Sequence, residues 1–382
     1  MFQSMQDLNK GIKLFFSPRS KGYFTRKDIP AVIALGTGIL LSLLTFILVD
    51  RLEFNDLKSD FLFDAENYSV ALGKSIDGNL NSLHAIEGLF ASSVSVTRAR
   101  FRTFVNKILP HSAGIHELRW APRVAASERK SYEAAAIRDG FSQYRFTELD
   151  SQRQLVTAGK REEYYPVYFA EPTGKSNAVL GLDLSARPAG RALMEKARDT
   201  GAAVATRRIM LRLENDPQFA FLVFQPLYRN AAPHDTVQER RKNLIGFAMG
   251  VFRMDDMVNA ALKDINLKGV ELSLFDEKAD SERRVLYSNV RRENTASGVV
   301  TFTSTVNVAD RIWTVQFHPT PDYLAAHRTH YSWAVLAAGL ISTFFLALYV
   351  MNMKRRTEEQ QVRRISAERQ VVETQLRMLQ AQ

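Results

Sequence analysis

Two long apolar runs stand out in the pattern of hydrophobic and polar positions along the chain. Residues 29–49 and 331–351 each contain 21 consecutive residues without a charged side chain. An α-helix rises about 1.5 Å per residue, so each run is long enough to cross the roughly 30 Å hydrocarbon core of a membrane. The pattern therefore predicts two transmembrane helices. The first run is longer than the apolar core of a signal peptide, and no small-residue cleavage site follows it, which favours an uncleaved anchor over a signal peptide.

Residues 50–110 follow the first run with apolar side chains at helical spacing and without a proline before residue 110. The apolar positions that set this spacing are Phe61, Leu62, Ala65, Tyr68, Val70 and Leu72. The pattern predicts a long helical stalk, broken once, that ends at the proline.

The next part of the chain, residues 111–232, alternates strand and helix signals. Strands are predicted in 114–124, 164–172, 204–213 and 219–228, and the last is apolar on both faces, which is typical of a central strand. One predicted helix begins with Ser127 as its N-cap and stops at Gly140. A second helix starts at Ser185 and stops at Gly201. Its expected buried stripe consists of Ala189, Ala192, Leu193 and Ala197.

Residues 233–330 repeat this kind of pattern after a polar stretch, 229–243. A strand (244–252), a short helix (254–264) and four consecutive strands separated by turn signals are predicted there. The expected fold class is thus an α+β membrane receptor. Two transmembrane helices flank an extracytoplasmic part with a helical stalk and two PAS-like α+β subdomains, membrane-distal (111–232) and membrane-proximal (233–330).

The distribution of charge orients this arrangement. Residues 1–28 carry six basic side chains against two acidic ones, and Lys354, Arg355 and Arg356 follow the second apolar run. Positive charge gathers on the cytoplasmic side, which predicts that both termini are cytoplasmic and that residues 50–330 are periplasmic at a bacterial inner membrane. The net charge of +10 lies largely beside the membrane spans, so nucleic acid is not an expected partner. The chain has no cysteine, which excludes disulfides.

Several segments together resemble the CHASE domain, the extracytoplasmic sensor module of cyclases and histidine kinases. They are "LFASSVSVTRARFRTFV", "LRWAPRVAASERKSYE", "YYPVYFAEP", "LGLDLSARPAGRALMEKARDTGAAVAT" and the strand ending "FQPLY". The resemblance implies a helical stalk, a distal PAS-like subdomain that holds a small extracellular ligand, a proximal PAS-like subdomain and a homodimer. It also implies a cytoplasmic output, such as a histidine kinase acting on a response regulator, or a diguanylate cyclase.

The resemblance also points to site residues. In plant cytokinin receptors of this family, an aspartate that matches Asp183 accepts hydrogen bonds from an adenine-type ligand. A neighbouring strand offers backbone groups at the position of Ala205, with Thr206 beside it, although the plant proteins carry a larger aliphatic residue there. Tyr168 and Phe224 are candidates to stack on a planar ligand. Each also has a plain structural interpretation, as a helix-entry acid for Asp183 and as core residues for the two aromatics.

Residues 352–382 are predicted to form a cytoplasmic signalling helix. Its apolar positions Val362, Ile365, Val372, Leu376 and Leu379 follow the spacing of a two-stranded coiled coil. No metal-ligand spacing, catalytic constellation or cofactor motif is present. No catalytic residue is therefore expected in this chain, which is interpreted as the sensing half of a longer receptor with a histidine kinase output. The alternative is a membrane-anchored structural or protein-interaction module without a small-molecule ligand.

Overall fold

The computed structural model of the 382-residue chain describes residues 29–380 except 173–178, 212–217, 264, 266, 268 and 291–299. For residues 371–380 it describes the backbone only, so the side chains of Val372, Leu376 and Leu379 lie outside the described part, as does the basic segment 1–28. The chain forms two compact units. One is Lys58–His327, and the other joins the part before Leu57 to the part after Arg328.

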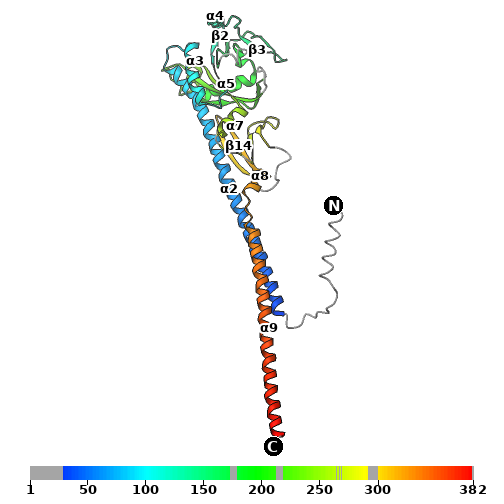
Figure 1. Ribbon diagram of the computed structural model, residues 1–382. Coiled ribbons are helices and arrows are strands. Elements are labelled where there is room, and N and C mark those ends of the chain that lie inside the picture. Colours follow the sequence, from blue (N-terminus) through cyan, green and yellow to red (C-terminus); the bar gives the residue numbers. More distant parts are fainter. Residues whose placement is uncertain are drawn as a thin grey trace. The chain divides into compact units, whose positions relative to one another are not determined.

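The second of these units is helical and carries both apolar runs. Helix α2 (Ile29–Ala91) begins in this unit, and helix α9 (Tyr331–Gln380) ends it (Figure 1). Their most apolar 18-residue windows have mean hydropathies of 2.6 and 2.2, and only 6% and 11% of those windows are buried. Both helices are therefore long and apolar enough to cross a membrane, and they turn most of their apolar surface outward, as lipid-facing helices do.

Small residues bring α2 and α9 into close contact inside this unit. A Cβ atom on Gly38 would lie 2.4 Å from a side-chain atom of Thr343, and one on Gly339 would lie 2.5 Å from the Ser42 hydroxyl. At the polar end of the pair, Glu53 accepts a hydrogen bond from the Ser332 amide at 3.2 Å. Close approach through glycine, serine and threonine is the usual way for helices to pack in a membrane.

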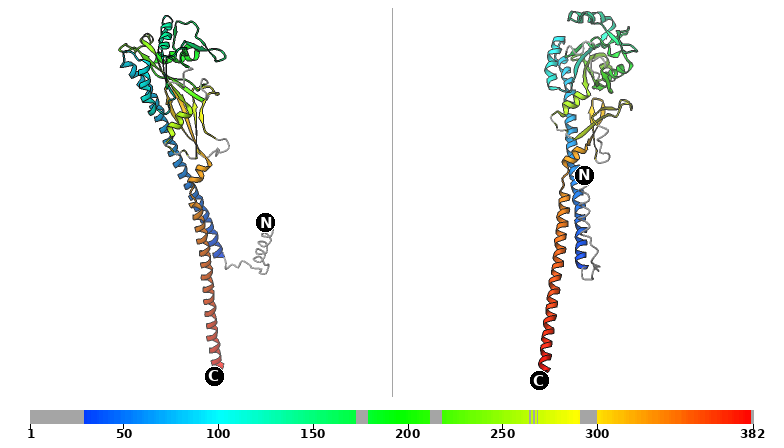
Figure 2. Two further views of the ribbon diagram at one scale, coloured as in Figure 1. Left: turned by 45° about the horizontal axis from the view of Figure 1, so that its top comes forward. Right: turned by 45° about the vertical axis from the view of Figure 1, so that its right-hand side comes forward.

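The other unit, which we call the sensor unit, combines α2 from Lys58 onward with two β-sheets (Figures 1 and 2). Its remaining helices are α3 (Arg98–Ile108), α4 (Arg129–Arg138), α5 (Pro188–Thr200), α6 (Val237–Asn243), α7 (Met254–Leu262) and α8 (Pro321–His327). Short 3-10 turns are η1 (Leu109–His111), η2 (Ala126–Glu128) and η4 (Leu184–Ala186). The single break predicted in the stalk lies between α2 and α3.

The first sheet has the strand order β6-β1-β10-β9-β7, and β8 pairs with β9 beside β7. Its strands are β1 (Glu117–Pro122), β6 (Phe169–Glu171), β7 (Val204–Ala205), β8 (Ile209–Leu211), β9 (Gln218–Tyr228) and β10 (Leu244–Arg253). All its pairings are antiparallel, with Trp120 opposite Ala248 and Ala248 opposite Gln225. Two short two-stranded sheets accompany it, β2 (Val124–Ala125) with β5 (Glu163–Tyr164) and β3 (Thr147–Leu149) with β4 (Leu155–Thr157).

The second sheet has four strands in the order β12-β11-β14-β13. They are β11 (Val270–Asp276), β12 (Val285–Ser288), β13 (Phe302–Val308) and β14 (Arg311–Pro319). The strand β14 pairs through residues 313–319 with β11 on one side and through residues 311–317 with β13 on the other. The mixed α+β class is confirmed, while the PAS-like character of the two subdomains stays a prediction.

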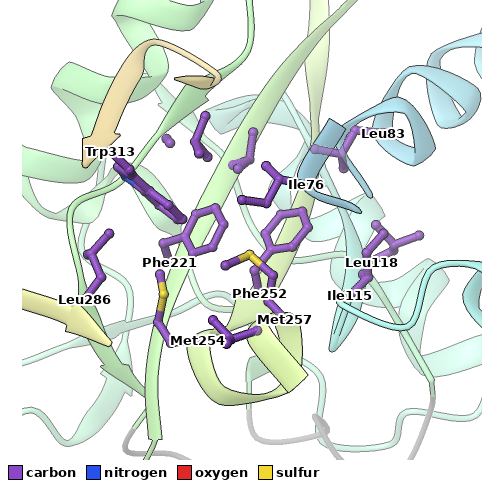
Figure 3. Packing of buried hydrophobic residues seen from close by; sticks show 14 of the residues in the cluster. Ile76, Leu83, Ile115, Leu118, Phe221, Phe252, Met254, Met257, Leu286 and Trp313 are labelled. Carbon is purple, nitrogen blue, oxygen red and sulfur yellow. The ribbon is translucent and has the colours of Figure 1, made fainter. Parts of the chain in front are cut away.

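The first sheet buries a different apolar cluster on each face. One face packs Leu118, Phe221 and Phe252 against residues of α2, and this cluster continues to Trp313 of the second sheet (Figure 3). The Phe221 ring lies 4.8 Å from Phe252 and 4.9 Å from Trp313. The opposite face packs a separate cluster against α5. Burying one such side chain contributes about 1.5–3 kcal/mol, so both faces hold the sheet in place.

The strand at 244–253 lies elsewhere than the sequence suggested. It was assigned to the proximal subdomain, but as β10 it lies between β1 and β9 in the first sheet, and the polar stretch before it forms α6. Nine of its ten residues are apolar or glycine and most are buried. A strand buried on both faces carries no alternation that would name its partners, so only the long-range pairing reveals its sheet.

Two helix starts and one buried stripe also differ from expectation. Ser127 lies inside η2 and α4 begins at Arg129, while α5 begins at Pro188 after Arg187, so neither Ser127 nor Ser185 is the helix cap. The helix α5 buries Met194 and Ala197. Ala189 and Ala192 are exposed and Leu193 is partly buried, because the face of α5 that meets the sheet is centred on Met194 and Ala197. The stop at Gly201 is confirmed, with a left-handed φ of 75°.

Candidate functional site

A cavity of about 370 Å³ opens beside α5, over the face of the first sheet that packs against this helix. It is lined by Arg161, Glu162, Glu163, Tyr165, Ser185, Arg191, Met194, Glu195, Arg198 and Phe247. Four of these residues belong to α5 at positions 191, 194, 195 and 198, a spacing that places their side chains on one helical face. The other walls come from the segment around β5, from η4 and from β10.

The floor of the cavity is apolar and aromatic. Met194 and Phe247 are almost fully buried, and the Tyr165 ring lies 5.6 Å from the Phe247 ring. The Tyr165 hydroxyl donates to a carboxylate oxygen of Glu163 at 3.1 Å. Burial, together with the charge of Glu163, raises the pKa of Tyr165 well above its usual range, so its hydroxyl stays a neutral donor.

The rim carries three arginines and three glutamates, and several of them already have partners. Glu163 binds Arg123 at 2.7 Å, and Arg198 binds Asp199 at 2.7 Å. Arg191 is different, because its Nε atom donates only to the Ser185 carbonyl oxygen at 3.3 Å. Among the described residues no carboxylate lies within ion-pair distance of Arg191, which leaves most of its guanidinium free at the cavity mouth.

Asp183 lies behind the cavity wall and not in it. Its side chain is completely buried, and its Oδ1 atom accepts hydrogen bonds from the Tyr165 amide (3.0 Å), the Ser185 amide (3.1 Å) and the Ser185 hydroxyl (2.8 Å). Its Oδ2 atom accepts from Arg161 at 3.3 Å. Tyr165, Ser185 and Arg161 all line the cavity. The buried acid therefore positions three wall residues at once.

Ala205 and Thr206 are fixed by contacts away from the cavity. The Ala205 amide donates to the Asp310 carboxylate at 2.8 Å. The Thr206 amide donates to the Leu222 carbonyl oxygen at 2.8 Å, and the Thr206 hydroxyl accepts from the Leu222 amide at 3.0 Å. The backbone amides of both residues are therefore already hydrogen-bonded at the edge of the first sheet.

Tyr168 and Phe224 belong to the two different apolar clusters of the first sheet. Phe224 is buried with its ring 6.3 Å from Phe247, directly beneath the cavity floor. Tyr168 packs edge-on against Tyr144 at 5.8 Å, and the Arg98 guanidinium lies 5.4 Å from its ring centre. The structure brings Asp183 and Phe224 close to the cavity, and it places Tyr168 in the other cluster.

None of the residues that line this cavity was among the site residues predicted from the sequence. A signal for Arg191, Met194 and Arg198 was present, because they lie at helical spacing in the expected helix. The contributions of Arg161 and Phe247 had no local signal, since they join the site only through folding. Among the residues that the structure describes, no three histidine, aspartate or glutamate side chains gather as metal ligands would.

Comparison with known proteins shows which family the part of the chain around this cavity matches. The family model described as "CHASE domain" matches residues 94–287, just over half of the chain. The chain belongs to the CHASE-domain family. The match begins before α3 and ends in β12, so it includes the cavity and every residue that lines it.

A relative of this CHASE-domain chain is the hybrid signal transduction histidine kinase A of Dictyostelium discoideum. It is 24% identical over 348 residues, which cover 83% of this chain and 16% of the relative. The chain thus spans about a sixth of the length of that kinase.

Two solved sensor domains resemble the CHASE-domain chain more distantly. The ligand-binding domain of the Pseudomonas aeruginosa amino acid chemoreceptor PctC is 10% identical, with a TM-score of 0.39, covering 68% of this chain and 98% of that one. The periplasmic sensory domain of the Campylobacter jejuni chemoreceptor Tlp1 is 11% identical, with a TM-score of 0.41, covering 71% and 96%.

Proposed function

We propose that this chain is the sensing part of a transmembrane receptor and that the cavity beside α5 binds a small ligand. The observation that carries the proposal is the composition of this cavity. Its apolar floor of Met194 and Phe247 lies below a rim of opposite charges, and Arg191 has no ion-pair partner among the described residues. A volume of about 370 Å³ suits a small molecule.

The rim favours a ligand that carries both signs of charge. An anionic group can bind Arg191 through two parallel hydrogen bonds, the geometry that a guanidinium offers to a carboxylate. A cationic group can face the exposed carboxylates of Glu162 and Glu195 across the mouth. A small zwitterion satisfies both groups, and its uncharged part covers the apolar floor.

An adenine-like ligand remains the competing proposal from the family resemblance. It would need the Asp183 carboxylate as an acceptor, but both oxygens already take protein donors and the side chain is completely buried. An adenine ring would have to displace the Arg161 contact to reach it. The zwitterion needs no such rearrangement, so we favour it.

The decisive experiment is a thermal-stability screen of the full chain in lipid nanodiscs with the twenty proteinogenic amino acids and with adenine. A ligand at 100 times its dissociation constant adds about 2.7 kcal/mol of stability, which is a clear rise in melting temperature. We expect a rise with at least one amino acid in the parent and in Arg138→Ala, an exposed arginine on α4, and none in Arg191→Ala. A rise with adenine alone would support the competing ligand. No rise with any compound would support a structural or protein-binding module.

The remaining steps of the proposed function concern the cytoplasmic side. We propose a homodimer whose α9 helices pair through the stripe that starts at Val362 and Ile365, since both side chains are exposed and lie three residues apart. The output would be a histidine kinase that acts on a response regulator, as the name of the Dictyostelium relative suggests.

A further inference from the structure

The turn between β13 and β14 makes an unusual contact with the first sheet. Ala309 has a left-handed backbone with φ of 52°, which turns the next residue, Asp310, toward α5 and β7. One Asp310 carboxylate oxygen accepts from the Ala205 amide at 2.8 Å, and the other accepts from Lys196 at 2.6 Å. Asp310 thus binds the Ala205 amide of the edge strand β7 and the Lys196 side chain of α5 at the same time.

The α5 end of this contact is next to the cavity. Lys196 directly follows Glu195 and lies two residues after Met194, and both of these line the cavity. A helix of 13 residues moves as a rigid segment, so a ligand that draws Arg191 and Arg198 inward also moves Lys196. Any such movement acts directly on Asp310.

On its other side, Asp310 is continuous with the strand β14. Asp310 is followed by β14, which is stiffened by pairing on both sides and by Trp313, packed edge-on against Phe221. The nine residues of β14 span about 30 Å and continue into α8. There the Tyr323 hydroxyl donates to Asp64 of α2 at 3.1 Å.

We infer that Asp310 couples the ligand cavity to α8 and that β14 carries the displacement. The inference rests on the proposed function only in taking the cavity as the place where the signal enters. Asp310 does not touch the ligand. It acts as a positioning residue through which a displacement of α5 changes the position of α8 at the opposite end of the sensor unit.

A second link between the sheets provides a matched control. Arg207 binds Asp280 at 2.6 Å, and Arg208 donates to the Glu282 carbonyl oxygen at 2.9 Å. These contacts end on the segment before β12, which is an edge strand with no direct continuation into α8. Asp280→Ala therefore loosens the same pair of sheets without touching β14.

The test uses the full chain in nanodiscs and needs no ligand. Because the chain has no cysteine, Leu324→Cys places a single thiol on α8, where the parent side chain packs against the core. Ala197→Trp then wedges α5 away from the sheet from the cavity side, since Ala197 is fully buried, and Ala197→Val is a milder wedge if the first variant fails to fold. The readout is the rate at which a maleimide labels the thiol.

We expect the wedge to change the labelling rate about fivefold when Asp310 is present and when Asp280 is replaced by alanine. In Asp310→Ala the wedge should leave the rate nearly unchanged. An equal response with and without Asp310 would overturn the inference, as would the same loss of response in Asp280→Ala or no response in the parent. Since no ligand is added, an intact response from a chain that binds no amino acid would refute the ligand proposal alone.

Discussion

At the scale of single residues, Asp183 shows how a buried charge can organise a binding site without entering it. Its carboxylate accepts from Tyr165, from Ser185 twice and from Arg161. An acid at a helix entry contributes only about 0.3–1 kcal/mol through the helix dipole. Its four contacts contribute more than the dipole does, because removing the acid would leave the amides of Tyr165 and Ser185 without an acceptor and would take one of two carboxylate partners from Arg161.

We therefore expect Asp183→Ala to lower the free energy of unfolding by about 2–4 kcal/mol, well beyond the helix-entry effect. For a unit of this size the melting temperature should fall by about 6–12 °C. Differential scanning calorimetry of the chain in detergent measures this change. Asp150→Ala is the control, since Asp150 accepts only from amides in an exposed turn. An equal loss of unfolding free energy in the two variants would show that the buried hydrogen bonds of Asp183 stabilise the fold no more than those of an exposed turn.

Asp199 gives the sensor unit a pH dependence through the junction of α5 and α6. Hydrogen bonds from Arg241 and Arg198 hold the pKa of this carboxyl well below its usual value of 3.8. A carboxyl with a lowered pKa stabilises the folded state above its unfolded pKa, and this contribution is lost as the pH falls through the folded value. Melting temperatures measured from pH 6 down to about pH 2 should fall more steeply in the parent than in Asp199→Asn. Parallel curves would contradict this assignment.

At the scale of elements, the two apolar helices were predictable because the sequence signal for a membrane span is local. A run of uncharged residues and its flanking charges suffice, and no distant partner is needed. The same holds for the stop of α5 at Gly201, whose left-handed backbone favours glycine. The face that α5 buries was not predictable from the helix alone, because alanine fits exposed and buried positions equally and the contact with the sheet selects Met194 and Ala197.

The packing of α2 against α9 depends on Gly339. We expect Gly339→Leu to separate the two helices, because even a Cβ atom there would meet the Ser42 side chain. Gly36→Leu is a matched control in the same region, since nothing lies within 4 Å of the Cβ position at Gly36. Cysteines in place of Phe46 and Trp333, whose ring centroids lie 5.1 Å apart, should be joined by a short bifunctional thiol cross-linker in membranes of the parent and of Gly36→Leu. Cross-linking in Gly339→Leu at the parent rate would disprove this role.

At the scale of the whole molecule, the sequence predicted the order of spans, stalk and α+β region, and the family resemblance located Asp183 near a cavity. The cavity itself was not predictable. It requires α5, the segment around β5 and Phe247 of β10 to meet, and these pieces are spread over residues 161–247 of the sequence. Local patterns describe each of these pieces, whereas only the pairing of β10 with β1 and β9 brings them together.

The direction of the chain across the membrane is a prediction at this same scale. The charges beside the two spans favour cytoplasmic ends and a periplasmic sensor unit. Alkaline phosphatase is active only outside the cytoplasm, so a fusion after Asp280 should be active and a fusion after Gln382 inactive. Activity from the fusion after Gln382 would reverse the assigned orientation of the second span.

The position of β10 also has a consequence for biogenesis. In the predicted orientation, translocation in the order of the sequence delivers β1, β6 and β9 to the far side of the membrane before the strand that lies between β1 and β9 emerges. Until residue 253 has passed the membrane, β1 and β9 each have an open edge, the state in which a sheet can pair with a wrong strand. Non-local pairing of this kind is slow to form. In that orientation the first sheet stays incomplete until the late strand β10 pairs with β1 and β9.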